Sequence, residues 1–218
     1  LDAPDEVASP YFGPGVSDLF QKYYGLGEDR YIQEKLDSNR FVMERFDAIQ
    51  SRVQAQKDPV YAGLQFSILG NYLDFSALQG QVSFDQLDEM LEKALEAELD
   101  MAVYADFCRE LQNGKKLLYL TDNAGEIGFD RIFAQQLHKA YPHLDITFCV
   151  RGGNAQNDAT RADAAAVGIE FPVIDSGCAL AGTEISLLGQ EARAAMLGAD
   201  VILAKGQGNA EPLLDCGD

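Results

Sequence analysis

The pattern of hydrophobic and polar positions divides the chain into two parts near Gly114. In the first part, apolar residues recur at helical spacing, as they do from Phe41 to Val53. The mostly apolar run 61–72 predicts a buried helix, and Ser83 is a favourable N-cap for an amphipathic helix after it. Residues 1–114 are therefore predicted to form an all-helical N-terminal subdomain.

The second part alternates short apolar runs with longer amphipathic ones. Strands are predicted at 117–121, 145–150, 171–174 and 201–204, with helices at 126–140, 155–167 and 184–197. Strands separated by helices of this length form right-handed crossovers in a parallel sheet. We therefore predict an α/β fold, with a Rossmann-like three-layer domain over residues 115–218 behind the helical subdomain. Because this sheet is small, we expect the natural domain to continue beyond Asp218.

Composition limits the classes of partner. The chain has 218 residues and a formal net charge of −18 at pH 7, which argues against nucleic acids and anionic membranes, since both need clustered Lys and Arg. No run approaches the ~20 apolar residues of a membrane span, and the first residues lack the pattern of a signal peptide. The 4 cysteines form no Cys-x-x-Cys pair, so we expect free thiols and a cytoplasmic protein.

Polar loops follow three of the predicted strands directly. They are Asp122–Glu126, Arg151–Thr160 and Lys205–Asn209. Because ligands bind outside the carboxyl ends of strands in an open α/β sheet, these loops should meet at one crevice. The carboxylates, carboxamides and lysine around it suit a hard, oxygen-liganded metal beside a phosphate.

The first of these loops begins with Asp122 and Asn123. Asp122 could cap the helix that follows, but a carboxylate next to a carboxamide, before the small residues Ala124 and Gly125, also fits a ligand approached closely by backbone. The spacing favours Asp122 as a metal ligand, with Asn123 adding a neutral oxygen. Glu126 either stabilises the helix N-terminus or orients a water molecule, and the sequence leaves both roles open.

The second loop carries Asn157 and Asp158 before the next predicted helix. Helix capping is again the simplest interpretation, but a second carboxylate at a neighbouring strand end is what an octahedral metal site needs. We include Asn157 among the candidate substrate contacts. Thr160 either helps to bind a phosphate or caps the helix.

The third loop is the most specific of the three. Lys205 ends a buried strand, which is costly unless its ammonium points into a polar crevice. The glycines favour a backbone nest for an anion, so Lys205, Gly206 and Asn209 are candidate phosphate contacts. The string is not a Walker loop, and the first strand is not followed by the Gly-x-Gly-x-x-Gly of a dinucleotide-binding fold.

Several ordered strings resemble a known family, the metal-dependent damage-control phosphatases. They are DNAGEIGFD, RGGNAQNDAT, SGCALAGTE and AKGQGNAE, preceded by DPVYAGLQFSILGNYLDF. The resemblance covers roughly residues 28–214. It implies hydrolysis of phosphomonoesters of small metabolites, such as sugar phosphates and phosphopantetheine-like or damaged compounds. It also implies a divalent metal: manganese, cobalt, nickel or magnesium.

The resemblance also assigns roles to individual positions. Gly153 stands where a proline is common and Ala210 where an aromatic is common, so these departures concern substrate preference. The metal ligands fall on Asp122, Asn123 and Asp158, the phosphate-binding lysine falls on Lys205, and Asn71 and Asp74 match a helical motif that borders the pocket.

The expected catalytic residues are Asp122, Glu126 and Asp158. Metal and lysine would neutralise charge that develops on the phosphoryl group, while Asp122 or Glu126 acts as the base. Asp122 could instead be a nucleophile, but Ala124 stands where such phosphatases carry a second Asp, so we favour the ligand role. Two other functions are weighed: a carboxyl methyltransferase using S-adenosylmethionine, whose glycine-rich first loop is missing, and a non-catalytic metal- or metabolite-binding module. The sequence leaves the oligomeric state open.

Overall fold

Helices fill the first part of the chain, as predicted. The computed structural model describes residues 12–72 and 84–214. The predicted helical region 41–53 is divided between two helices, because the chain turns at Glu44 and Arg45. The predicted N-cap, Ser83, lies outside the described residues. The helices are α1 (Gly13–Tyr24), the 3-10 helix η2 (Glu28–Tyr31), α2 (Ile32–Met43), α3 (Phe46–Gln54), α4 (Pro59–Tyr72), α6 (Phe84–Glu96) and α7 (Met101–Asn113).

Strands and helices alternate in the second part. The strands β1 to β4 form one parallel sheet in the order β3-β2-β1-β4, which confirms the predicted α/β fold. The elements are β1 (Lys116–Leu120), α8 (Glu126–Ala140), β2 (Asp145–Val150), α9 (Arg161–Ala166), β3 (Val173–Asp175), the 3-10 helix η3 (Ile185–Leu187), α10 (Gln190–Gly198), β4 (Val201–Ala204) and α11 (Gln207–Leu214).

Several predicted boundaries in this part are wrong. The strands predicted at 117–121 and 171–174 are β1 at Lys116–Leu120 and β3 at Val173–Asp175. Helix α9 starts only at Arg161, because Thr160 and Asp163 form a capping box in front of it. The predicted helix 184–197 is divided into η3 and α10 near Gly189. Gly189 lies close against Gly177, and a Cβ on Gly177 would be 2.7 Å from the Cα of Gly189. The predicted loop 205–209 is helical from Gln207 onward.

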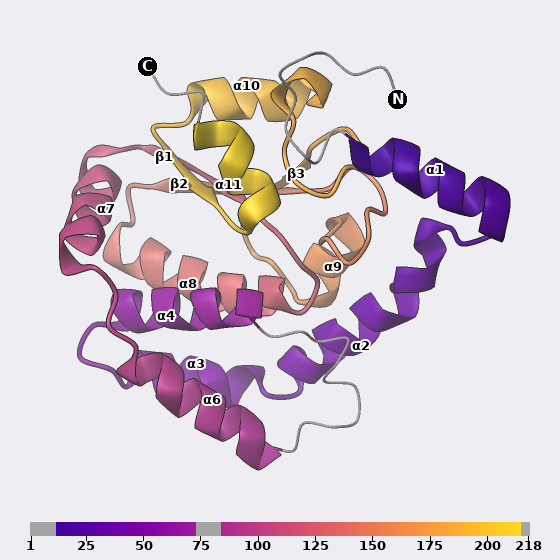
Figure 1. Cartoon of the computed structure of the whole chain (residues 1–218). Helices are drawn as coiled ribbons and strands as arrows, with labels where there is room; N and C mark the ends of the chain where they lie inside the picture. Colours follow the sequence, from indigo (N-terminus) through magenta and orange to yellow (C-terminus); the bar gives the residue numbers. More distant parts are fainter. Residues whose placement is uncertain (1–11, 73–83, 215–218) are drawn as a thin grey trace.

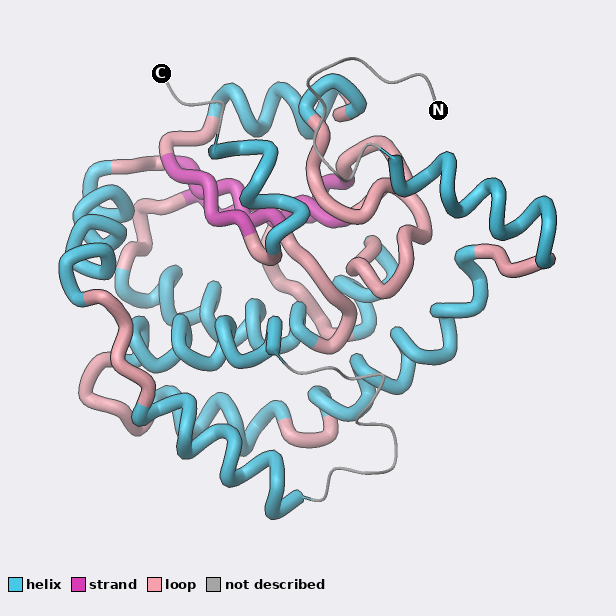
Figure 2. The backbone as a smooth tube through the Cα atoms, in the orientation of Figure 1, coloured by secondary structure: helices cyan, strands magenta, loops and turns pink. Residues whose placement is uncertain are grey.

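The elements stack in layers around the sheet (Figure 1). Helices α10 and α11 lie on one side of the sheet and α8 on the other, with α4 packed along α8 and with α3 and α6 outermost (Figure 1). Figure 2 shows the strands enclosed between these helices. Between the sheet and α8, Tyr119 stacks on Phe148 with ring centroids 4.7 Å apart, and both side chains are fully buried.

Helix α4 approaches α8 closely because two glycines face it. A Cβ on Gly63 would lie 3.3 Å from the Cα of Phe133, and one on Gly70 would lie 3.3 Å from the Cγ of Glu126. Larger residues would push the two helices apart. The close packing brings Ser67 and Asn71 of α4 to the N-terminal end of α8, where the first strand-end loop lies.

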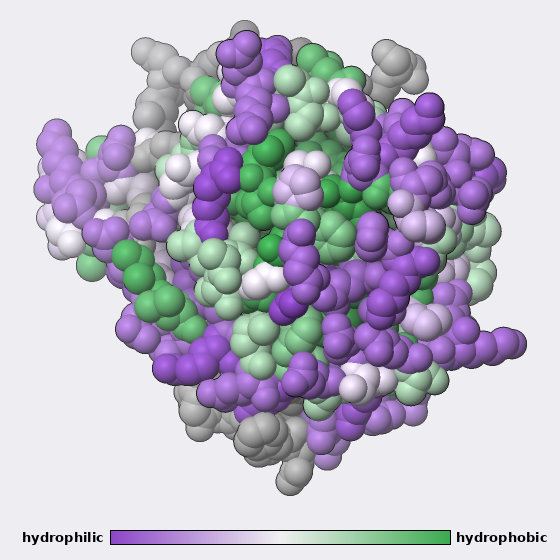
Figure 3. Space-filling view, turned by 180° about the vertical axis from the view of Figure 1, so that it is seen from behind, coloured by the Kyte–Doolittle hydropathy of each residue, from purple (hydrophilic) through white to green (hydrophobic). Residues whose placement is uncertain are grey.

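None of the helices in residues 12–72 and 84–214 is long and apolar enough to cross a bilayer. From behind, hydrophilic residues surround a hydrophobic area near the middle of the face (Figure 3).

Candidate functional site

The three strand-end loops meet, as the sequence predicts. Asn123 and Asp158 pair in an isolated antiparallel bridge between the first two loops. The Ala159 N–H donates to the carbonyl of Asp122 at 2.7 Å. Gly206, from the third loop, lies so close that a Cβ there would overlap the carboxylate of Asp122. The strand ends thus bring Asp122, Asn123 and Asp158 to one place.

Asp122 is held by two amides and by no cation among the residues that the structure describes. Its Oδ2 accepts hydrogen bonds from the side-chain amides of Asn71 and Asn123, both at 2.9 Å. Within the described ranges it has no salt-bridge partner. Burial and the neighbouring carboxylates of Asp158 and Glu126 raise the pKa of Asp122 to about 7. A cation beside Asp122 would relieve this repulsion.

The metal-free protein should lose stability as the pH rises toward neutrality. The pKa of Asp122 is raised from 3.8 to about 7 on folding. Between these values the folded chain holds a proton that the unfolded chain has lost, so unfolding becomes easier as the pH increases. Between about pH 5.5 and about pH 8, the ionisation of Asp122 should lower the free energy of unfolding by about 2 kcal/mol. Urea denaturation in the presence of a chelator measures it.

Asp122→Asn is the control for that measurement, because an amide does not titrate. The variant should lose the part of the pH dependence that comes from Asp122 and keep the part that comes from Asp130 and Asp158, whose pKa values burial also raises. Equal slopes in the variant and the unmodified protein would show that Asp122 does not titrate in this range.

Lys205 and Glu126 form a buried ion pair behind Asp122. The Lys205 ammonium donates to Glu126 Oε1 at 2.6 Å, to Asp130 Oδ1 at 2.9 Å and to the Ser67 carbonyl at 2.9 Å. The lysine therefore points into a polar interior, where its three donors all bond to protein groups and none is left in this arrangement for the predicted phosphate. Glu126 Oε2 accepts from both the backbone N–H and the side-chain amide of Asn123, at 3.3 and 3.0 Å.

Asp158 is paired with a cation that sequence analysis did not single out. Arg151, which is 2% exposed, donates from Nε to Asp158 Oδ2 at 2.6 Å. The Gly182 N–H donates to the same oxygen at 3.3 Å. Burial raises the pKa of Asp158, and the guanidinium opposes this. An arginine directly after a buried strand was a usable signal, because its charge needs a carboxylate partner there.

Asn209 holds the loops together from within. Its Oδ1 accepts from Arg151 Nη2 at 2.9 Å and Thr183 Oγ1 at 2.7 Å. Its Nδ2 donates to the carbonyls of Thr121 and Lys205 at 2.8 and 2.6 Å. The side chain is fully buried, and these four bonds use the whole capacity of an amide. In this arrangement Asn209 has no group left for a substrate.

The remaining predicted residues are Asn157, Thr160 and Asp74, and none of them forms a side-chain hydrogen bond with Asp122 within the described residues. Asn157 contributes its carbonyl to the N–H of Ala124 at 2.9 Å, and its half-buried side chain lies on the same loop as Asp158. Thr160 caps α9, so the capping interpretation is confirmed for it. Asp74 lies outside the described residues.

Helix α2 connects the first loop to the start of α9 through Asn39, which the sequence did not reveal. Asn39 Oδ1 accepts from the Gly125 N–H at 2.8 Å, where Gly125 precedes α8 with a φ of +80°. Its Nδ2 donates to Asp163 Oδ1 at 2.8 Å in the capping box of α9. Lys35 pairs with the same carboxylate at 2.7 Å. These contacts join residues far apart in sequence, so no local pattern predicts them.

The donor set fits a divalent cation that prefers oxygen. Among the described residues, no three side chains of Asp, Glu, His and Cys come together as a metal site, so the Asn123 amide would have to be a ligand. Asp122, Asn123 and Asp158 each have an Oδ1 that accepts no hydrogen bond from the described part of the chain. Two carboxylates and a carboxamide oxygen are hard ligands.

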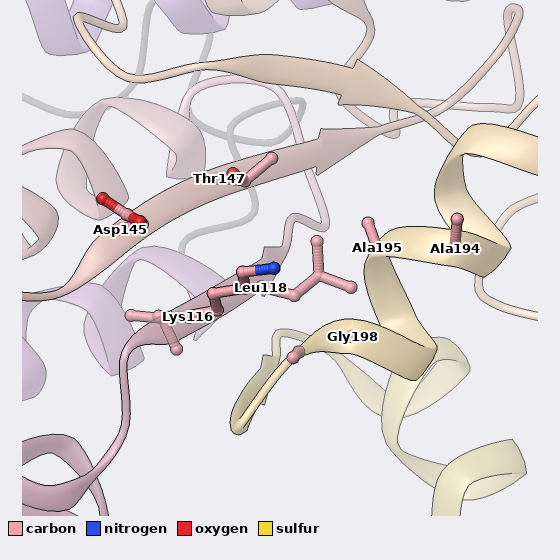
Figure 4. A pocket seen from close by; sticks show the side chains of 9 residues that line it. Lys116, Leu118, Asp145, Thr147, Ala194, Ala195 and Gly198 are labelled. Atoms are coloured by element: carbon pink, nitrogen blue, oxygen red, sulfur yellow. The ribbon is translucent and has the colours of Figure 1, made fainter.

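A separate pocket lies at the opposite edge of the sheet (Figure 4). It has a volume of about 300 Å³, and its lining includes Lys116 and Asp145 at the amino ends of β1 and β2, with Ala195 and Gly198 of α10. Because the candidate side chains lie at the carboxyl ends of these strands, this pocket is not part of the candidate site.

Comparisons with known proteins agree with the fold and the motifs. A damage-control phosphatase of Pyrococcus horikoshii is 31% identical over 203 residues, which cover 92% of this chain and 68% of that protein. One of Archaeoglobus fulgidus is 30% identical, over 86% of this chain and 65% of that protein. The crystal structure of a DUF89 family protein from P. horikoshii superposes with a TM-score of 0.81 and 30% identity, covering 94% of this chain and 70% of that one. The profile of the damage-control phosphatase ARMT1-like domain matches residues 7–217, and the chain therefore belongs to that family.

Proposed function

We propose that this protein is a metal-dependent phosphatase that hydrolyses phosphomonoesters of small metabolites in metabolite repair. The substrate class is that of sugar phosphates and phosphopantetheine-like or damaged phosphometabolites. The names of the relatives support a phosphatase. The observation that carries the proposal is the convergence of Asp122, Asn123 and Asp158 at one edge of the sheet, each with an Oδ1 not hydrogen-bonded within the described residues.

The divalent ion would be held by these three side chains, and manganese, cobalt, nickel and magnesium all suit oxygen ligands. When bound, it supplies Lewis-acid stabilisation of the charge on the phosphoryl oxygens. Asn71 and Asn123 donate to Asp122 Oδ2, so they orient its other oxygen toward the ligand side. Arg151 does the same for Asp158.

The remaining residues divide between proton transfer and electrostatics. Glu126 is fully buried and both of its oxygens accept hydrogen bonds, so it positions its neighbours and is not open to water. Asp122 is then the better candidate to accept the proton of the attacking water. Lys205 balances the charge of Glu126 at the base of the site, so the divalent ion would supply the positive charge that favours an anionic substrate.

Metal dependence and Asp158 give the direct test. Protein stripped of metal should release no phosphate from a panel of phosphorylated metabolites. Turnover should return when a divalent ion is added back, and the rates with the different ions are then compared. Asp158→Asn should lower turnover about a hundredfold or more, because it removes one ligand charge. Calorimetric titration with S-adenosylmethionine is a separate measurement, and tight binding there would favour the methyltransferase. Folded, metal-loaded protein that binds ligands without turnover would instead be a binding module.

A further inference from the structure

Asp130 is a buried carboxylate that the proposed reaction does not use. It lies one helical turn after Glu126 on α8 and is fully buried. Its Oδ1 accepts hydrogen bonds from Ser67 Oγ at 2.8 Å, Tyr119 OH at 2.8 Å and Lys205 Nζ at 2.9 Å. Its Oδ2 is also buried and has no hydrogen-bond partner among the described residues.

Stability alone does not account for this carboxylate. Glu126 already balances the charge of Lys205, so an ionised Asp130 adds a second negative charge to a buried pair. Surplus buried charge is unfavourable, and so is a buried oxygen without a donor. An apolar side chain would carry neither of these two costs. Local costs of this kind are typical of positions selected for function.

The contacts of the ammonium show what Asp130 achieves. Lys205 is held by α4 through the Ser67 carbonyl and by α8 through Glu126 and Asp130. Tyr119, on β1, holds Asp130 in turn. Because these elements pack tightly, the ammonium has one well-defined position.

The Lys205 ammonium is linked to the candidate metal ligands by a series of hydrogen bonds. Lys205 fixes Glu126, and Glu126 accepts from the amides of Asn123 and Asn71. The same two amides donate to Asp122. The contacts therefore run without a gap from Asp130 to Asp122.

We infer that Asp130 is a positioning residue of this site: with Tyr119 and Ser67 it fixes the Lys205 ammonium against Glu126, and so orients the two amides that hold Asp122. The inference rests on the proposed phosphatase activity for its consequence in turnover. The placement of Lys205 by Asp130 can be tested without any activity.

The first measurement is the kinetics of Asp130→Asn, which keeps the shape and removes the charge. With manganese and the best substrate of the panel, kcat should fall about tenfold or more while KM changes about threefold or less. The thermal midpoint should change little, because the gain from removing surplus buried charge opposes the cost of burying amide N–H groups that have no acceptor. Asp145→Asn is the matched control, since it removes an exposed carboxylate at the far edge of the sheet and should leave all three values unchanged.

The second measurement is the NMR signal of the Lys205 ammonium, assigned by its absence in Lys205→Met. A buried, fully bonded ammonium exchanges protons slowly, so its N–H correlation should be visible in the unmodified protein and shifted or lost in Asp130→Asn. Tyr119→Phe should cause a smaller shift, and it decides the question if Asp130→Asn does not fold.

The two measurements separate the possible failures. If the unmodified protein turns over no substrate, the proposed function fails, and the NMR signal alone tests the placement of Lys205. An unchanged Lys205 signal in Asp130→Asn overturns the inference whatever the kinetics. An altered signal with unchanged kcat also overturns it, because Asp130 would then have a structural role only.

Discussion

Replacing Asp122 with Asn should reduce phosphate release by on the order of 10² to 10³ while the protein remains folded. The carboxylate lies where the first two loops meet, and unlike the carboxylate of Asp158 it has no salt-bridge partner among the described residues. An amide would keep an acceptor for Asn71 and Asn123 but would lose the charge that attracts a cation. Initial rates with manganese measure the loss of turnover, and calorimetric titration with manganese measures the loss of metal affinity.

The same substitution should not harm the metal-free fold. Because burial and neighbouring carboxylates raise the pKa of Asp122 to about 7, a neutral side chain suits this position when no cation is present. The melting temperature of the chelated variant at neutral pH should equal or exceed that of the unmodified protein. A variant with near-normal turnover and manganese affinity would remove Asp122 from the metal site.

Gly206→Ala should disturb the same carboxylate from the other side. Gly206 has a φ of +77°, and a Cβ there would overlap Asp122. The left-handed backbone costs about 1–3 kcal/mol for a residue with a side chain, and relief of the overlap must displace Asp122. We expect lower stability in urea denaturation, with turnover and manganese affinity reduced about tenfold or more.

Gly198→Ala is the matched control for this glycine substitution. Gly198 ends α10, and a Cβ there would meet no atom within 4 Å. Its effect on stability should be small and its effect on turnover absent. If Gly206→Ala behaved like Gly198→Ala, the close contact between the third loop and Asp122 would be wrong.

The parts of the fold that depend on local pattern were predictable from sequence. The helix 126–140 and the strands 145–150 and 201–204 have the predicted bounds. Each has a clear pattern of apolar residues and is bounded by residues that are unfavourable in the element. The predicted helix 184–197 failed at Gly189, where contact with Gly177 overrides helix propensity. No local pattern contains that contact.

The same distinction applies to the candidate site. Adjacent polar residues at strand ends placed Asp122, Asn123 and Asp158 together, since the rule for open sheets needs only the order of elements. The groups that hold them were not found. Arg151 could have been identified as a charge directly after a buried strand, whereas Asp130 acts through Lys205 on a different element, so its role follows only from tertiary packing.

The position of Asn39 has a consequence for how the chain can be divided. The change of secondary structure near Gly114 looks like a natural place to exchange the helical part between relatives. Yet one amide of that part binds Gly125 ahead of α8 and Asp163 at the start of α9. A hybrid protein would keep the geometry of its candidate site only if the donated helices brought an amide that matches the carboxylate of the recipient. In this chain, the helical part and the sheet therefore have to be exchanged as a compatible pair.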